Sequence, residues 1–260
     1  MYDFPWIAAA NDALWRAIST RLAAAGCPAP AVLTRGADLY GLCMNPQLIF
    51  GQTCGYPYVS FLHPHVVLVA TPIYDFPGCV GPENCSFLVA RKSGGPKNLA
   101  EFRGARALVN NPDSNSGMNR FRAMVAPIAG GRPFFANVRV SGSHAASLDA
   151  IVANRADLAS IDCVTFALMQ RGRPALMANI QVVARTAMTP GLPFVMSNRL
   201  APTHLQDLRL ALVDVLADPQ LAPARKTLGL SGMQIVSPAD YDRVAELERA
   251  AVAAGYPQLA

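Results

Sequence analysis

Apolar side chains recur along the chain with two different periods, one typical of helices and one typical of strands. Residues 11–26 repeat apolar positions at helical spacing, with Asn11 or Asp12 near the start and Gly26 as a stop signal. Short β-type runs bounded by Gly and Pro follow at 46–52, 66–71 and 86–91. The first third of the chain is therefore predicted to contain both kinds of element.

The middle of the chain alternates regularly between the two periods. A stretch rich in Gly, Pro and Lys, 92–102, indicates a crossing between two bodies. Strands are then predicted at 105–110, 134–140, 156–161 and 180–186, with helices between them. After 189–197 the pattern changes, and helices are predicted at 203–218, 219–229 and 238–255. Strands that alternate with helices predict an α/β fold with mainly parallel sheets flanked by helices.

The composition excludes several classes of protein. Hydrophobic residues make up 52% of the 260 positions and charged residues 15%, which supplies a large core and argues against disorder. The formal charge is +5, but the basic residues are scattered singly, so we expect no nucleic-acid partner. No apolar run approaches the roughly 20 residues that span a bilayer, so no membrane span is expected.

The first residues lack a basic segment followed by an apolar one, which is the pattern of a secretory signal. The sequence as written therefore predicts a cytoplasmic location, and a periplasmic one if upstream residues have been removed.

Cysteine and histidine spacing does not indicate a metal centre. Six cysteines occur without any CxxC pair, at positions 27, 43, 54, 79, 85 and 163. We expect buried free thiols, with a disulfide between Cys79 and Cys85 as the alternative in an exported protein. His63 and His65 flank Pro64 without a nearby third ligand. Neither a metal ion nor a cofactor is expected.

Polar residues follow the ends of several predicted strands. In open α/β sheets, ligands bind beyond the carboxyl ends of the strands. The residues in these places carry hydrogen-bonding groups and few charges: Gln52, Thr53, Tyr56, Thr71, Tyr74, Asn110 to Ser116, Ser141, Ser143, His144 and Asp162. They predict a binding site for a small polar ligand.

The stretch NNPDSNSGMNRF (110–121) stands where a predicted strand leads into a helix. Its small polar residues have two readings. They are typical of a helix N-cap, and they also suit an anion site, because free amides and the helix dipole attract negative oxygen there.

Three segments together resemble a known family. NNPDSNSGMNRFR, then VSGSHAASLDAIVANRADLASIDCVTFAL, then TPGLPFVMS resemble the phosphonate/phosphate-type solute-binding proteins of ABC transporters, over about residues 48–200. QTCGYPY (52–58) and PGC (77–79) resemble a subgroup that often lacks an export signal. The resemblance implies a two-lobed type II periplasmic binding fold. We expect residues 1–91 and 189–260 to form one lobe, and residues 92–188 to form the inserted second lobe.

The resemblance also implies roles for single residues. Ser114, Asn115, Ser116 and the Gly117 amide would hold the oxyanion, with Asn115 where the family usually has Thr. In the family, the residues that match His144 and Asp162 face the other end of the ligand. Tyr56, Tyr74 and Gln52 would close over the ligand from the first lobe. The implied function is binding of a phosphonate-, phosphate- or phosphite-like anion for an uptake system, with an ABC permease as partner and no catalysis.

Other readings of these residues stay open. His144 and Asp162 each stand at a predicted helix start and would serve there as caps, and Tyr56 and Tyr74 would serve as packing between lobes. A cytosolic enzyme on the same fold would use Cys54 or Cys163 as a nucleophile, with His144 as the available base. A cytosolic sensor would instead pass the ligand state to a partner.

Overall fold

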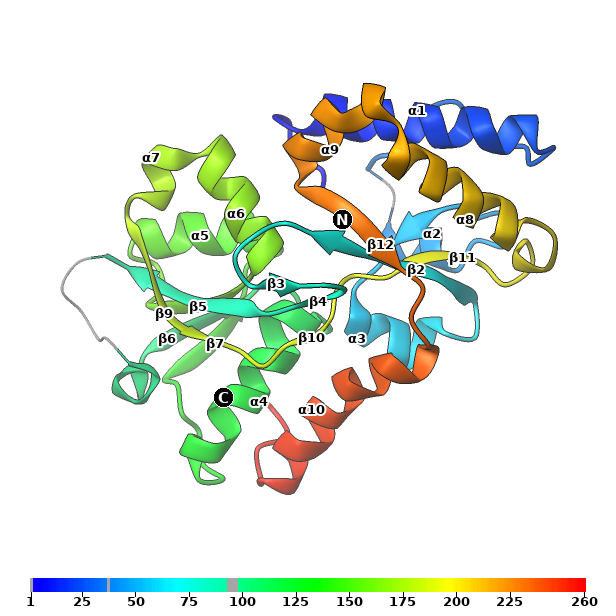
Figure 1. Cartoon of the computed structure of the whole chain (residues 1–260). Helices are drawn as coiled ribbons and strands as arrows, with labels where there is room; N and C mark the ends of the chain where they lie inside the picture. Colours follow the sequence, from blue (N-terminus) through cyan, green and yellow to red (C-terminus); the bar gives the residue numbers. More distant parts are fainter. Residues whose placement is uncertain (1, 37, 93–97) are drawn as a thin grey trace.

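Two α/β lobes lie side by side in the computed structural model, which describes residues 2–36, 38–92 and 98–260 (Figure 1). The family-like two-lobed architecture is therefore confirmed. The connections that join the lobes run through the middle of the molecule, where three short strands form a small sheet.

The first lobe is built on a sheet whose described strands have the order β1-β11-β2-β12. One face is covered by three helices, and the apolar side of the first of them is buried through Leu14, Ile18 and Leu22 at helical spacing. The opposite face packs on the η1 turn and on Tyr241. The elements are α1 (Ala8–Ala24), α2 (Leu39–Cys43), β1 (Gly51–Gln52), α3 (Gly55–Pro57), η1 (Tyr58–Leu62), β2 (Val66–Tyr74), β11 (Phe194–Ser197), α8 (Ala201–Ala217), η4 (Pro219–Leu221), α9 (Ala222–Leu228) and β12 (Leu230–Gln234).

The second lobe is built on a sheet whose described strands have the order β7-β6-β8-β5-β9. Its central strand β8 is buried along its whole length, because helices cover both faces. The elements are β5 (Ser86–Arg91), η2 (Leu99–Phe102), β6 (Arg106–Val109), η3 (Asn115–Asn119), α4 (Arg120–Ala129), β7 (Asn137–Val140), α5 (His144–Val152), β8 (Leu158–Asp162), α6 (Cys163–Gly172), α7 (Pro174–Met177) and β9 (Ile180–Arg185).

The strand directions correct the prediction of mainly parallel sheets. In the first lobe the described pairings are all antiparallel, because β2 leads out of the lobe, β11 leads back, and β12 returns beside β2. In the second lobe β6 runs parallel to β7 and β8, whereas β5 is antiparallel to both of its neighbours. Hydrophobic periodicity identifies strands but carries no information on their direction.

The crossing between the lobes lies earlier than residue 92. Strand β5 already belongs to the second-lobe sheet, so the outward connection runs through 75–85. This connection contains β3 (Cys79–Val80) and β4 (Glu83–Asn84), which form a small sheet with β10 (Thr189–Pro190) of the return path. Of the predicted crossing at 92–102, residues 93–97 lie outside the described residues.

The end of the chain forms a third link between the lobes. After η5 (Pro238–Tyr241), helix α10 (Asp242–Ala253) packs against both η1 and α4. Tyr256 is buried in the second-lobe core, and the carbonyl of Ala260 accepts hydrogen bonds from the amides of Phe134 (2.6 Å) and Phe135 (3.1 Å). The last residues, expected to be part of the first lobe, therefore pack on the second.

This packing makes Tyr256 a test of the third link. We expect Tyr256→Ala to lower the free energy of unfolding by about 3 kcal/mol, because a buried aromatic side chain is lost and a cavity is left. The exposed Val252→Ala on the preceding helix is the control, with an effect of about 0.5 kcal/mol or less. Urea unfolding of both variants measures the difference, and equal effects would show that the link carries no stability.

Candidate functional site

The turn after β6 is shaped by Ser114. Its backbone is extended, and its side chain accepts a hydrogen bond from the amide of Gly117 (3.0 Å), which is an N-cap. The carbonyl of Ser114 also accepts from the amides of Met118 and Asn119, at 3.1 Å and 2.9 Å. The chain therefore begins its helix with one wide π turn, η3, which continues without a break into α4.

The amides of this turn are mostly used inside the protein. Asn115 donates its amide to the sulfur of Cys54 (3.2 Å), and Gly117 donates to Ser114. Among the described residues, the amide of Ser116 has no acceptor. The turn is thus an N-cap, as one reading predicted, and the groups that it offers to a ligand are its hydroxyls and the Ser116 amide.

A cavity of about 270 Å³ lies between the lobes, in front of this turn. Both lobes contribute to its wall, so the ends of β6 and β8 and the starts of α5 and α6 face residues from the beginning of the chain. The polar residues of the wall are Tyr2, Tyr40, Cys54, Asn110, Asn111, Asp113, Ser114, Ser116, Ser143, His144, Asp162 and Thr165.

Three polar atoms of this wall are buried without a partner among the described residues. They are Oη of Tyr2, Oδ1 of Asn110 and Nδ1 of His144. Buried polar atoms are nearly always hydrogen-bonded, and leaving one unpaired costs about 1–3 kcal/mol. All three residues line one cavity, which indicates a place where a polar ligand supplies missing partners.

His144 is held by Ser116, with 2.9 Å between its Nε2 and the serine Oγ. Burial lowers the pKa of His144 to about 4, although the carboxylate of Asp162 acts in the opposite direction. The ring is therefore neutral at neutral pH. When the Ser116 hydroxyl donates to Nε2, the ring proton is on Nδ1, and that unpaired atom becomes a donor to the cavity.

Two carboxylates also reach the cavity. Asp162 caps α6 by accepting from the amide of Thr165 (2.8 Å), and its other oxygen is 3.4 Å from Nδ2 of Asn84. Asp113 accepts a hydrogen bond from the hydroxyl of Tyr40, and burial raises the pKa of Asp113. The site therefore combines neutral donors with carboxylate acceptors.

Arg120 is a buried cation next to the site that sequence reasoning missed. Its side chain is 2% exposed and donates to Oγ1 of Thr189 (2.6 Å), Oδ1 of Asn84 (2.7 Å) and Oγ of Ser86 (3.3 Å). These acceptors belong to both connections between the lobes. The sequence offered one signal for this residue. It is charged and comes directly after the turn of residues 114–119, in a helix whose other inward positions are mostly apolar.

The structure brings four of the predicted site residues to the cavity: Ser114, Ser116, His144 and Asp162. Asn115 points away, with its side-chain amide on Oγ1 of Thr189 (3.1 Å). Gly117 lies behind the wall, where a Cβ would be 1.7 Å from Oδ1 of Asn110. A side chain at position 117 would thus displace Asn110.

The predicted first-lobe residues do not line this cavity. Tyr56 donates to Glu248 (2.6 Å), and the amide of Gln52 is 3.5 Å from the hydroxyl of Tyr74. Tyr2 and Tyr40 stand there instead. Neither tyrosine follows a predicted strand, so the expectation that ligands bind beyond strand ends did not identify them.

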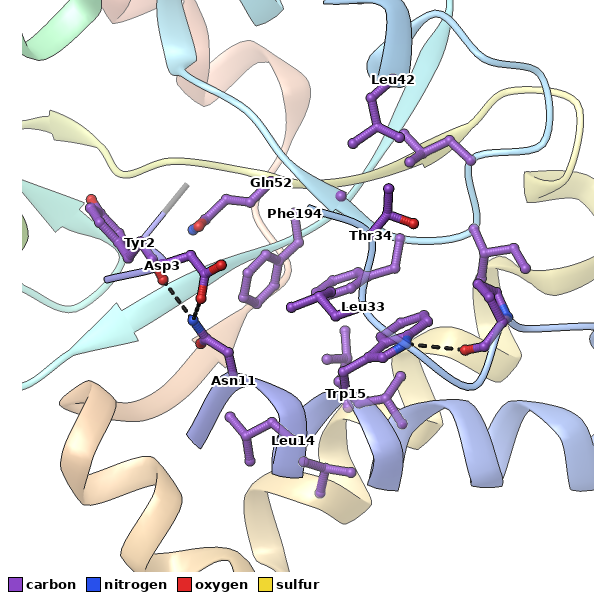
Figure 2. Close-up of a pocket in the computed structure, with 18 of the residues that line it drawn as sticks. Tyr2, Asp3, Asn11, Leu14, Trp15, Leu33, Thr34, Leu42, Gln52 and Phe194 are labelled. Carbon is purple, nitrogen blue, oxygen red and sulfur yellow. Dashed lines mark hydrogen bonds between the residues drawn. The ribbon is translucent and has the colours of Figure 1, made fainter. Parts of the chain in front are cut away.

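Gln52 and Tyr74 line a second, mostly apolar pocket of about 380 Å³ in the first lobe, part of which is drawn in Figure 2. Trp15, Leu33 and Phe194 form much of its wall (Figure 2). Tyr2 lies between the two pockets, with its ring edge-on to Tyr74 at 5.4 Å. Apolar walls suit an apolar group and not an oxyanion.

The described part of the chain contains no cluster of three or more His, Cys, Asp or Glu side chains arranged to hold a metal ion. No helix in that part is long and apolar enough to cross a membrane.

One family model matches most of the chain. The model for the periplasmic substrate-binding protein of phosphonate ABC transporters matches residues 45–241. A search among curated proteins finds no match.

Three solved structures share the fold. The binding protein of an ABC phosphonate transporter from Pseudomonas aeruginosa has a TM-score of 0.75 and 17% identity, covering 95% of this chain and 85% of that one. PhnD1 from Prochlorococcus marinus in complex with methylphosphonate has a TM-score of 0.68 and 14% identity, covering 93% of each chain. A Xanthomonas citri protein bound to ATP has a TM-score of 0.70 and 15% identity, covering 94% of this chain and 95% of that one.

The lowered pKa of His144 predicts a pH-dependent stability. The unfolded chain takes up a proton near the ordinary pKa of about 6.5 and the folded protein only near 4, so stability is complete above that range and falls as the pH drops through it. Between about pH 7.5 and about pH 5, the wild type should lose about 2 kcal/mol more than His144→Gln. Urea unfolding at both pH values checks this. Equal losses in both proteins would mean that His144 titrates normally.

Proposed function

The chain belongs to the family of periplasmic substrate-binding proteins of phosphonate ABC transporters, and from this premise we propose that it binds a small oxyanion between its lobes for delivery to an ABC permease. The observation that carries the proposal is the interlobe cavity with unpaired buried polar atoms on Tyr2, Asn110 and His144. A protonated oxyanion supplies partners of both kinds, because its oxygens accept from Tyr2 and His144 and its hydroxyl can donate to an acceptor such as Oδ1 of Asn110. Ser114 adds a hydroxyl and Ser116 its backbone amide at the start of the η3–α4 helix, where the helix dipole favours negative charge.

The carboxylates of the cavity restrict the ligand to an oxyanion that carries a proton. A fully deprotonated anion would face Asp162 and Asp113 across a low-dielectric space, which is repulsive. A P–OH group instead donates to Asp162 in a charge-assisted hydrogen bond. Phosphate, phosphite and methylphosphonate keep such a proton in part of their population near neutral pH, whereas sulfate does not. The ligand class is therefore a protonated phosphorus oxyanion.

Residues from both lobes meet at the ligand, so binding couples to lobe closure. Tyr2 and Tyr40 approach from the first lobe, and Ser116 and His144 from the second. Closing the gap removes water and strengthens each hydrogen bond to the anion.

The rival enzyme hypothesis requires a thiol next to a base. Cys54 lines the cavity, but the Nε2 atom of His144, the base that it would need, is bonded to Ser116. Hydrogen bonding to Cys79 and burial raise the pKa of Cys163, which disfavours a thiolate there. These contacts support binding without catalysis. A cytosolic sensor on the same fold remains the second hypothesis, which predicts a change in oligomer size on ligand addition.

Titration calorimetry tests the oxyanion site. We expect heat of binding with phosphate, phosphite or methylphosphonate. Ser116→Ala should bind about 10-fold to 100-fold more weakly, because it removes the hydroxyl that holds His144 with Nδ1–H toward the anion, and a hydrogen bond to a charged group contributes about 1.5–3 kcal/mol. Ser231→Ala makes the same chemical change on exposed β12 and should bind like the wild type. The absence of heat with all three anions would overturn the proposal.

The role of Asp162 is tested by selectivity. The wild type should bind sulfate at least about 100-fold more weakly than phosphate, because sulfate has no proton to donate. Asp162→Asn keeps an N-capping side chain but removes the charge, so the ratio should fall by about 10-fold or more. If the ratio of phosphate affinity to sulfate affinity is the same in the variant and the wild type, Asp162 does not accept a hydrogen bond from the ligand's proton.

A further inference from the structure

Three thiols from separate parts of the chain meet behind the cavity wall. Cys79 belongs to β3 of the outward connection, Cys85 directly precedes β5, and Cys163 is the first residue of α6. The sulfur atoms of Cys79 and Cys163 are 3.5 Å apart. The amide of Cys163 donates to the carbonyl of Cys85 at 3.2 Å, so the third thiol belongs to the same group.

Gly78 allows this approach. Its φ of +95° is a conformation that favours glycine, and a Cβ there would lie 2.9 Å from Cβ of Cys163 and 3.0 Å from the sulfur of Cys85. A larger residue at position 78 would push the connection away from α6. The close packing of the connection on the second lobe therefore depends on this glycine, and it brings Cys79 against Cys163.

We propose that Cys79 and Cys163 form a redox modification site, in which oxidation joins them in a disulfide that ties the outward connection to the second lobe. The sulfur atoms need to approach by about 1.5 Å to reach the disulfide length of about 2.05 Å. Both residues are at the ends of short elements, where a shift of this size is small. The pairing differs from the Cys79–Cys85 link that spacing alone suggested, because the fold places the sulfur atoms of Cys79 and Cys163 3.5 Å apart.

The reaction needs an oxidant, which we take to be a peroxide. Cys79 is the partly exposed thiol of the three, so it is the point of entry. Its thiolate attacks one oxygen of hydrogen peroxide, giving a sulfenic acid and hydroxide, which takes up a proton to become water. The sulfur of Cys163 then attacks the sulfenic sulfur, loses its proton, and expels the hydroxyl as a second water molecule. Two thiols lose two electrons in total, and the peroxide gains them.

Peptide mapping tests the pairing directly. The folded protein is treated with hydrogen peroxide, alkylated at low pH, and digested with trypsin and a glutamate-specific protease. Glu83 lies between Cys79 and Cys85, so cleavage there separates the two cysteines. We expect a peptide with Cys79 linked to the one with Cys163, and the same link in Cys85→Ser. The Tm of the oxidised protein should rise by about 5 °C or more, because the disulfide closes a long loop.

The control variants separate this site from general oxidation. Cys79→Ser and Cys163→Ser should each lose the link and the rise in Tm, while Cys27→Ser, which removes a buried thiol of the first-lobe core, should keep both. A dominant link between Cys79 and Cys85, or sulfinic acid at Cys79 without any link, would overturn the proposal. The readout is independent of ligand binding, so it stands or fails apart from the proposed function.

Discussion

The geometry of the site depends on the buried guanidinium of Arg120. This side chain holds the start of α4 to Asn84 and Ser86 on the outward path and to Thr189 on the return path. Its acceptors are neutral, so the cation is balanced by many dipoles and not by one carboxylate in direct contact. The turn of residues 114–119, just before Arg120, is thereby fixed relative to both connections between the lobes. The proposed anion site is therefore tied to both connections between the lobes.

The proposed site would rely on neutral donors. The hydroxyls of Ser114 and Ser116, the imidazole of His144 and the hydroxyl of Tyr2 carry no formal charge, and nearby carboxylates make the space slightly unfavourable for a bare anion. On the proposed function, selectivity would come from matching donors and acceptors one by one, because an ion without a proton would be repelled by Asp162. A site lined by lysine or arginine would bind more anions with less discrimination.

Sequence patterns predicted the second-lobe half of the site better than the first-lobe half. Ser116, His144 and Asp162 follow strands whose carboxyl ends meet at one edge, so their proximity follows from the α/β alternation. Tyr2 and Tyr40 reach the cavity through tertiary packing, and no local pattern marks them. Tyr56 follows a predicted strand, as a site residue would. In the fold, however, its hydroxyl donates to Glu248, which is distant in the sequence, and the side chain does not line the cavity. The antiparallel strand pairs were not predicted for a related reason: the direction of a strand relative to its neighbours depends on the pairing of segments that are distant in the sequence.

Helix α10 sets a limit on how the two lobes move. It touches η1 in the first lobe and α4 in the second, and the residues after it are anchored beside Phe134. A wide swing about the crossing strands would separate α10 from one of these neighbours and expose apolar surface. Small sliding of α10 over α4 preserves both contacts. These contacts favour a short, shear-like displacement over a wide hinge rotation in any movement of the two lobes.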